Sequence, residues 1–155
     1  MMMRALREPA VRPGMTDAPA AACDAGAIRV DGPLKVDGLS RIRQAIADQA
    51  ATWGLDEHVV HAVQMVSSEL ATNIIVHAHG NGGLVITYRA GMIYCQAVDQ
   101  GPGMTLPFLA GWNAPASGDP TAARGLWMVR MLSARLQIDS SILGTTVTAV
   151  LIGKV

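Results

Sequence analysis

Three polar side chains, Glu69, Asn73 and His77, recur at intervals of four residues in one stretch of the chain. An α-helix, with about 3.6 residues per turn, would carry all three on one face. Apolar neighbours flank this row, which indicates that Glu69 and Asn73 lie against a core, where an unpaired carboxylate is costly. A Mg²⁺ ion that also binds phosphate oxygens would fit, because it prefers hard oxygen ligands. The alternative is a solvated helix face on which Asn73 bonds its own turn.

A second candidate is the turn Asp99-Gln100-Gly101-Pro102-Gly103-Met104, which follows an apolar run. A carboxylate at that edge can accept a hydrogen bond from an amino group such as the N6 of adenine. Gly101 and Gly103 would let the backbone approach a ligand that a Cβ would keep away. A plain turn is the alternative interpretation.

Two further segments contain glycine next to polar residues. Arg124-Gly125-Leu126 lies between a proline-rich stretch and a helical pattern, and could offer backbone N–H groups at a helix N-terminus to phosphate. Gly144-Thr145-Thr146 begins the last strand-like run. A simple helix start and a hairpin turn followed by β-branched residues explain these segments equally well.

Apolar periodicity predicts the elements that must position these residues. Steps of three and four predict a helix from Leu39 to Trp53, closed by Gly54, and a second helix from Asp56 to about His79. The segment Gly80-Asn81-Gly82-Gly83 is expected to end the second helix. A third helix is predicted over residues 126–136. Strands are predicted over residues 27–30, 84–89, 92–99, 136–141 and 145–152.

A long stretch rich in proline and glycine, residues 100–123, interrupts this pattern and is interpreted as a functional loop or lid. The order of elements then predicts an α+β fold. We expect a two-layer sandwich in which the helices cover one face of a mixed, mostly antiparallel sheet. Residues 1–26 show no periodicity and are expected to form a disordered leader.

Taken together, in this order and spacing, the four segments resemble the nucleotide-binding boxes of the histidine kinase-like (GHKL) ATPase superfamily. They are most similar to the small anti-sigma regulatory factors and switch serine kinases of the RsbW and RsbT type. The resemblance spans residues 27–155 and implies one ATP-binding domain of the Bergerat fold. It also implies ATP and Mg²⁺ as cofactors. The sequence contains no P-loop motif, which excludes the usual P-loop mode of phosphate binding.

The resemblance implies a role for each matched residue. Glu69 would be the general base, Asn73 would hold Mg²⁺, and Asp99 would bind the adenine amino group. Thr145 or Thr146 would close the adenine side. The full set of expected nucleotide-binding residues is Asn73, His77, Asp99, Gly101, Gly103, Met104, Arg124, Gly125, Leu126, Gly144, Thr145 and Thr146.

One position departs from the family pattern. The second glycine box of the family commonly reads Gly-x-Gly, whereas this chain has Gly125-Leu126-Trp127. Trp127 would either anchor in the core, leaving the phosphate contact to Gly125 and Arg124, or hinder closure of the lid and reduce phosphoryl transfer.

Two functions follow from the resemblance. The first is a serine/threonine kinase that transfers the γ-phosphate of Mg-ATP to a STAS-type anti-sigma-factor antagonist. The second is a non-catalytic regulator that sequesters a sigma factor or another partner, with the nucleotide as a structural ligand. The resemblance also allows a homodimer. The catalytic domain of a two-component histidine kinase is disfavoured, because no phospho-accepting helical hairpin precedes Ala27.

Composition excludes several other classes. The 155 residues suit one domain, and 12 Lys and Arg balance 12 Asp and Glu, which disfavours nucleic-acid binding driven by bulk charge. No apolar run approaches the ~18 residues of a membrane span, so we expect a cytoplasmic protein that does not enter membranes. The histidines lack the spacing of zinc ligands. His77 is expected instead to neighbour Glu69 or to act as a cation at the helix C-terminus.

Overall fold

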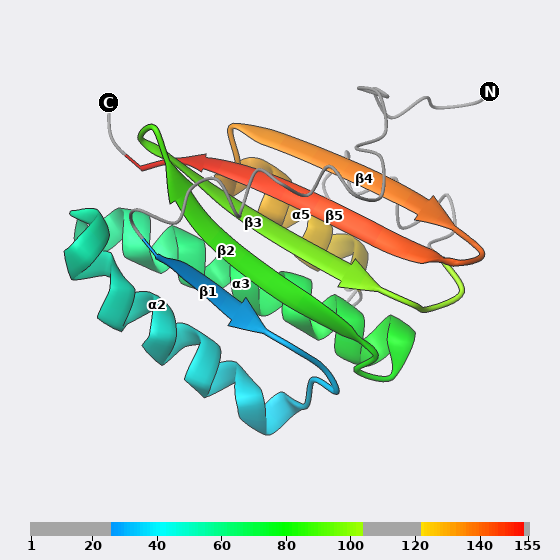
Figure 1. Cartoon of the computed structure of the whole chain (residues 1–155). Coiled ribbons are helices and arrows are strands. Elements are labelled where there is room, and N and C mark those ends of the chain that lie inside the picture. Colours follow the sequence, from blue (N-terminus) through cyan, green and yellow to red (C-terminus); the bar gives the residue numbers. More distant parts are fainter. Residues whose placement is uncertain (1–25, 104–121, 154–155) are drawn as a thin grey trace.

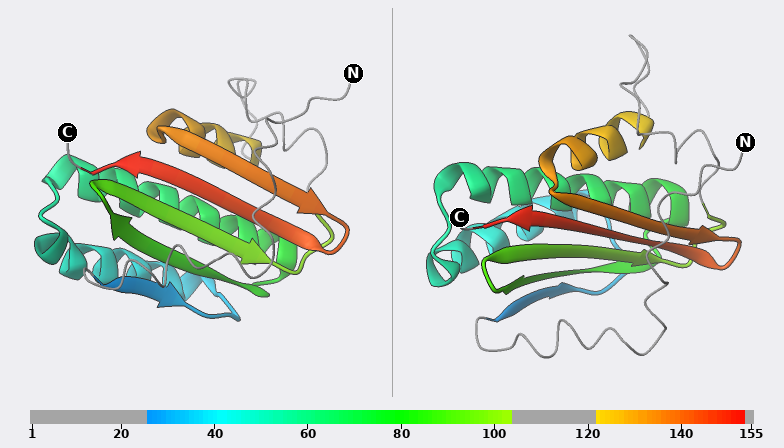
Figure 2. Two further views of the ribbon diagram at one scale, coloured as in Figure 1. Left: turned by 45° about the horizontal axis from the view of Figure 1, so that its top comes forward. Right: turned by 90° about the horizontal axis from the view of Figure 1, so that it is seen from above.

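The computed structural model describes residues 26–103 and 122–153. In these ranges a five-stranded sheet forms one layer, in the order β1-β2-β3-β5-β4, and the helices cover one of its faces (Figures 1 and 2). The elements are β1 Ala27–Val30, the 3₁₀ turn η2 Val36–Gly38, α2 Leu39–Trp53, α3 Glu57–Ala78, β2 Gly82–Arg89, β3 Met92–Asp99, α5 Ala122–Leu132, β4 Arg135–Ser141 and β5 Gly144–Ile152. This arrangement confirms the expected α+β sandwich.

All four strand pairings in the described sheet are antiparallel. Side chains alternate along a strand, so one set of alternate residues faces the helices and the other faces away. In β3 the helix-facing set is buried: Ile93, Cys95, Ala97 and Asp99. Their partners across the register in β5 are Leu151, Ala149, Val147 and Thr145, which are buried as well. The core therefore lies between this face and the helices.

The α2 helix follows the predicted boundaries. Its buried residues, Ile42, Ile46, Ala50 and Trp53, lie at steps of three and four, as the sequence pattern requires. Gly54 ends the helix in the left-handed conformation (φ 64°), which glycine adopts without a Cβ penalty.

The α3 helix is the central helix of the domain. It packs on β2, β3 and β5 and also contacts α2 and α5 (Figure 1). Its length and apolar composition would be sufficient to cross a membrane. The buried core helix of a globular domain can have the same length and composition. Its buried stripe, which includes Val63, Val66, Leu70 and Ile74, belongs to the main hydrophobic core.

Two expected boundaries are wrong. Gly82 and Gly83 belong to β2, where Gly82 pairs with Asp99, instead of ending the preceding helix. The third helix runs from Ala122 to Leu132, several residues earlier than expected. It stops there because the Ala134 N–H bonds the Val150 carbonyl (2.7 Å), so pairing with β5 replaces the helical pattern. The expected leader, apart from Gly26, and most of the expected lid lie outside the described residues.

Candidate functional site

The polar face of α3 is partly enclosed. Asn73 is only 4% exposed, and its Nδ2 has no hydrogen-bond partner among the described residues. A buried amide without a partner costs free energy, so such a group indicates a ligand or an ordered water. Glu69, one turn earlier, is half-buried, and this burial raises the pKa of its carboxyl group. The Asn73 Nδ2 can donate a hydrogen bond to a phosphate oxygen, whereas only the amide oxygen could ligate Mg²⁺, and the Glu69 carboxyl lies on the same face of the helix.

The turn after β3 lies against the end of α3. Asp99 is 8% exposed, and its Oδ1 accepts a hydrogen bond from the Gly101 N–H (2.9 Å). A Cβ on Gly101 would lie 2.8 Å from the His77 carbonyl oxygen, so only glycine fits this approach. The fold therefore brings the Asp99 turn next to the helix that carries Asn73.

The start of β5 lies beside the same turn. Thr145 pairs with Asp99 in the register and is 3% exposed, on the helix-facing side. Thr146 faces the opposite side of the sheet because side chains alternate. Gly144 approaches the Asp99 carbonyl so closely that a Cβ would clash with it. Of the two expected threonines, the register thus places Thr145 on the same face as Asp99.

Sequence reasoning missed one residue at this location. Ser140 on β4 faces Thr145, and their hydroxyl oxygens are 2.8 Å apart. The alternation of side chains along β4 places Ser140 on one face of the sheet. Only the register of the β4–β5 hairpin shows that Thr145 lies opposite it.

The first turn of α5 contacts Glu69. A Cβ on Gly125 would clash with the Glu69 Oε2. Gly125 was expected to precede a helix beginning at Leu126; it lies inside α5, because Ala122 and Ala123 are strong helix formers and extend the helix backwards. Leu126 is buried (1% exposed) and Trp127 is partly exposed. The expected phosphate contact of Gly125 stays a prediction.

The remaining expected residues divide as follows. His77 lies in the last turn of α3, about 12 Å along the helix axis from Glu69, so the two are not neighbours on the helix. Its expected place in the nucleotide site stays a prediction. The Gly103 backbone, with φ 87°, lies against the Ser141 carbonyl. Met104 and the Arg124 side chain are outside the described residues.

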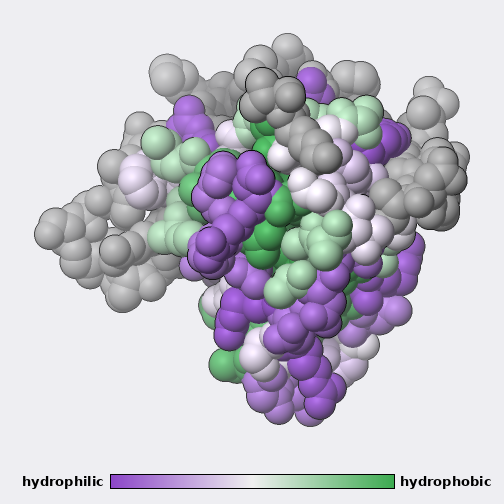
Figure 3. Space-filling view, turned by 90° about the vertical axis from the view of Figure 1, so that its left-hand side faces the viewer, coloured by the Kyte–Doolittle hydropathy of each residue, from purple (hydrophilic) through white to green (hydrophobic). Residues whose placement is uncertain are grey.

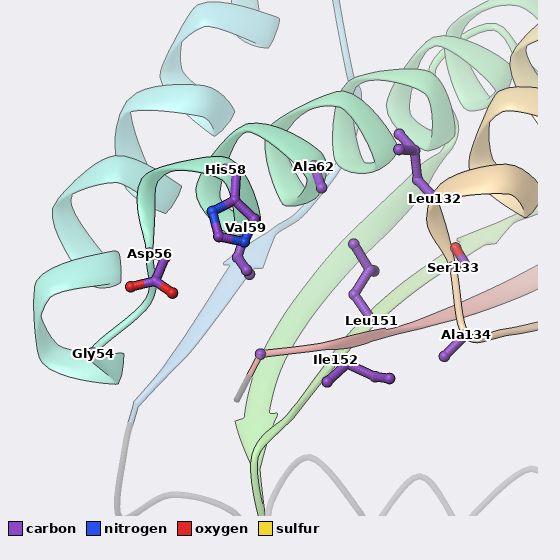
Figure 4. A pocket seen from close by; sticks show the side chains of 11 residues that line it. Gly54, Asp56, His58, Val59, Ala62, Leu132, Ser133, Ala134, Leu151 and Ile152 are labelled. Carbon is purple, nitrogen blue, oxygen red and sulfur yellow. The ribbon is translucent and has the colours of Figure 1, made fainter. Parts of the chain in front are cut away.

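Most of the expected site residues that the structure describes lie towards the end of the domain where α3 and β3 end and β5 begins, on the right in Figure 1, and Glu69 lies nearer the middle of α3. A cavity of about 740 Å³ lies at the opposite end, beside Gly54 (Figure 4). It is lined by apolar side chains such as Val59, Leu132 and Leu151, and Figure 3, which views this end, shows hydrophobic groups between hydrophilic ones. None of the expected site residues lines this cavity.

The chemistry of the polar end fits a magnesium-nucleotide complex. The Asp99 carboxylate has a second oxygen that can accept a hydrogen bond from an amino group, and its register partner Thr145 lies on the same face of the sheet. In the described part of the chain, no cluster of three His, Cys, Asp or Glu side chains could hold a metal ion. A Mg²⁺ ion near Asn73 would therefore take most of its ligands from phosphate oxygens and water, as Mg²⁺ commonly does.

Comparisons with known proteins concern the family and the fold of the chain. The sequence matches the family model of the histidine kinase-like ATPase domain over residues 32–151. No curated protein sequence matches the chain.

Among solved structures, the fold is similar to the RsbU and RsbW domains of Rv1364c from Mycobacterium tuberculosis (TM-score 0.60, 14% identity, 81% of this chain and 32% of that chain). It is also similar to the histidine kinase domain of the blue-light activated histidine kinase EL346 from Erythrobacter litoralis (TM-score 0.50, 19% identity, 73% of this chain and 62% of that chain). The chain thus spans about a third of the first structure and under two thirds of the second, and at these identities the likeness concerns the fold.

Proposed function

The chain belongs to the family of histidine kinase-like ATPase domains, and from this membership we propose that it binds Mg-ATP and phosphorylates a serine or threonine of a partner protein. The proposed partner is a STAS-type anti-sigma-factor antagonist. The protein would then be an anti-sigma regulatory factor of a partner-switching pathway, acting in the cytoplasm where ATP is available.

One observation carries the proposal: two carboxyl groups and an amide, all buried or partly buried, lie on α3 and at the end of β3, two elements that pack on each other. They are the buried carboxylate of Asp99, the buried amide of Asn73 that lacks a partner for Nδ2, and the desolvated carboxyl of Glu69. The Asn73 amide and the Glu69 carboxyl cost free energy by their burial unless a ligand satisfies them.

Nucleotide recognition is assigned to the sheet. Asp99 would accept a hydrogen bond from the adenine amino group, while Gly101 keeps Asp99 in place through its N–H. Thr145 would contact the neighbouring ring nitrogen of adenine. These groups fix the base, so the phosphates point towards α3 and α5 in the proposal.

Phosphoryl transfer is assigned to α3. When bound, Mg²⁺ would neutralise charge on the phosphate oxygens, with Asn73 as its protein ligand. Glu69 would accept the proton of the attacking hydroxyl while the new oxygen–phosphorus bond forms and the bond between the γ-phosphorus and the β,γ-bridging oxygen breaks, releasing ADP. The raised pKa of Glu69 makes its carboxylate a better base for this step.

The test of this proposal combines transfer with binding. The purified protein is incubated with ATP labelled at the γ-phosphate and a purified STAS-domain antagonist, and ADP binding is measured by calorimetry. Glu69→Gln should abolish transfer, a loss of at least about 100-fold, while ADP affinity changes little. Glu57→Gln, an exposed acid in the first turn of the same helix, should leave both unchanged. Unchanged transfer in Glu69→Gln would exclude Glu69 as the base.

Stoichiometric sequestration is the second candidate, and the contact between α5 and Glu69 favours it. Gly125 covers one side of the carboxylate, and the bulky Trp127 follows two residues later. Under this alternative the protein forms a stable complex with a sigma factor or antagonist, and light scattering would detect the complex while no label is transferred.

A further inference from the structure

Three polar side chains form a row across three adjacent strands. Ser140 on β4 pairs with Thr145 on β5, and Thr145 pairs with Asp99 on β3. The register places all three on the helix-facing side of the sheet. Asp99 and Thr145 are buried, and Ser140 is partly buried. The row thus extends the proposed adenine site by one residue, towards the edge of the sheet.

A hydrogen bond fixes the middle member of this row. The Ser140 and Thr145 hydroxyl oxygens are 2.8 Å apart, and either can be the donor. A hydroxyl has one hydrogen to donate and lone pairs that accept. If Ser140 donates to Thr145, the Thr145 hydrogen is left for a ligand.

We propose that Ser140 is a positioning residue that sets the base specificity of the site by donating to Thr145, so that the Thr145 hydroxyl donates to the ligand. This inference depends on the proposed nucleotide-binding function. It concerns which purine is bound and with what affinity, and it leaves the phosphoryl-transfer groups untouched.

The donor and acceptor groups on the purine edge support this direction of the hydrogen bonds. Adenine presents an amino donor, N6, beside a ring-nitrogen acceptor, N1. Asp99 can only accept hydrogen bonds when ionised, so it matches N6, and the neighbouring hydroxyl must donate to N1, directly or through one water. Guanine presents the reverse pattern, a carbonyl acceptor beside an N–H donor. A fixed donor at Thr145 therefore favours adenine and disfavours guanine.

The test compares ADP and GDP binding to the 155-residue chain by calorimetry. Ser140→Ala should weaken ADP binding by about five-fold, the equivalent of one net hydrogen bond, while GDP binding stays the same or improves, because the Thr145 hydroxyl can then rotate. Ser140→Thr keeps the hydroxyl and should restore ADP affinity. Thr148→Val removes a hydroxyl from the opposite face of β5 and should leave both affinities unchanged.

The outcomes separate this inference from the function on which it depends. Wild-type protein that binds no ADP contradicts the proposed function and, with it, the role of Ser140. Wild-type protein that binds ADP while Ser140→Ala keeps the same preference for ADP over GDP contradicts the role of Ser140 alone. Thermal unfolding of each variant identifies a loss caused by misfolding, and the failure of Ser140→Thr to restore affinity would also overturn the inference.

Discussion

The Glu69 carboxylate of α3 lies directly against the backbone of Gly125 in α5, a residue that has no side chain. A Cβ at Gly125 would clash with the Glu69 Oε2. The contact shields Glu69 from water on that side, in keeping with the raised pKa of its carboxyl group. The lack of a side chain at Gly125 therefore makes room for the Glu69 carboxylate.

Gly125→Ala should stabilise the protein less while Glu69 is present. Replacing glycine by alanine inside a helix normally gains about 1 kcal/mol, but here the new methyl group displaces the end of the Glu69 side chain, which should cancel part of that gain. In a Glu69→Ala background the clash is gone, so the same change should raise the free energy of unfolding. Urea unfolding of the four proteins in this cycle measures the coupling.

The control for this cycle is Met131→Ala, which changes an exposed residue on the same helix. It should have the same small effect with and without Glu69. An equal effect of Gly125→Ala with and without Glu69 would contradict the observed contact.

Glu69→Gln should stabilise the protein at neutral pH. Burial raises the native pKa above its ordinary value of 4.5, so as pH rises the unfolded chain ionises before the native state does. The carboxyl group therefore lowers stability progressively between that value and its native pKa, and the loss persists at pH 7. The gain from glutamine should be present at pH 7 and disappear near pH 4, as urea unfolding at both values would measure. The exposed Glu57→Gln should give no such gain, and an equal gain in both variants would contradict the burial of Glu69.

Asp99→Asn should weaken ADP binding at least about ten-fold, because a hydrogen bond to a charged acceptor contributes more than one to a neutral amide. The asparagine Oδ1 can still accept from Gly101, so the free energy of unfolding should change by less than about 1 kcal/mol. Asp139→Asn is the matched control, since Asp139 pairs with Thr146 on the other face of the sheet. Equal losses of ADP affinity in the two variants would exclude Asp99 as the adenine acceptor.

Asn73→Leu should stabilise the ligand-free protein and weaken its response to magnesium. Leucine removes a buried amide nitrogen that lacks a partner in the described structure, a change worth about 1 kcal/mol in favour of folding. The same change removes the proposed protein ligand of the metal, so ATP affinity should depend less on Mg²⁺ than in the wild type. Thermal unfolding and calorimetry with and without Mg²⁺ test both parts.

Thr72→Val serves as its control, since the Thr72 hydroxyl bonds its own helix at the Ser68 carbonyl. This variant should keep the magnesium dependence. If Asn73→Leu destabilised the protein, the amide nitrogen would not be unsatisfied in the native state. If the variant also kept the full magnesium dependence, Asn73 would not be a metal ligand.

Cys95 should resist thiol reagents in the native protein. The side chain is fully buried, and burial raises the pKa of its thiol to about 12, so almost no thiolate exists at pH 8. In a Cys23→Ser background, labelling of Cys95 should follow unfolding and accelerate with urea. Rapid labelling in native buffer would show that the core beneath β3 opens more readily than its burial indicates.

The sequence by itself determined the elements and the family resemblance. Periodicity is a local property, so the apolar steps from Leu39 to Trp53 and the alternation from Met92 to Asp99 could be read without knowing the fold. The order of the four glycine-containing and polar segments also lies in the chain itself. These signals located Glu69, Asn73 and Asp99 before any contact was known.

Only the tertiary structure decided which side chains meet. The choice of Thr145 over Thr146, and the contact of Thr145 with Ser140, depend on strand register, and a shift of one residue would reverse both faces. The approach of Gly125 to Glu69 depends on how α5 packs on α3, across more than fifty residues of chain. Such contacts depend on non-local packing, which no local pattern of the sequence encodes.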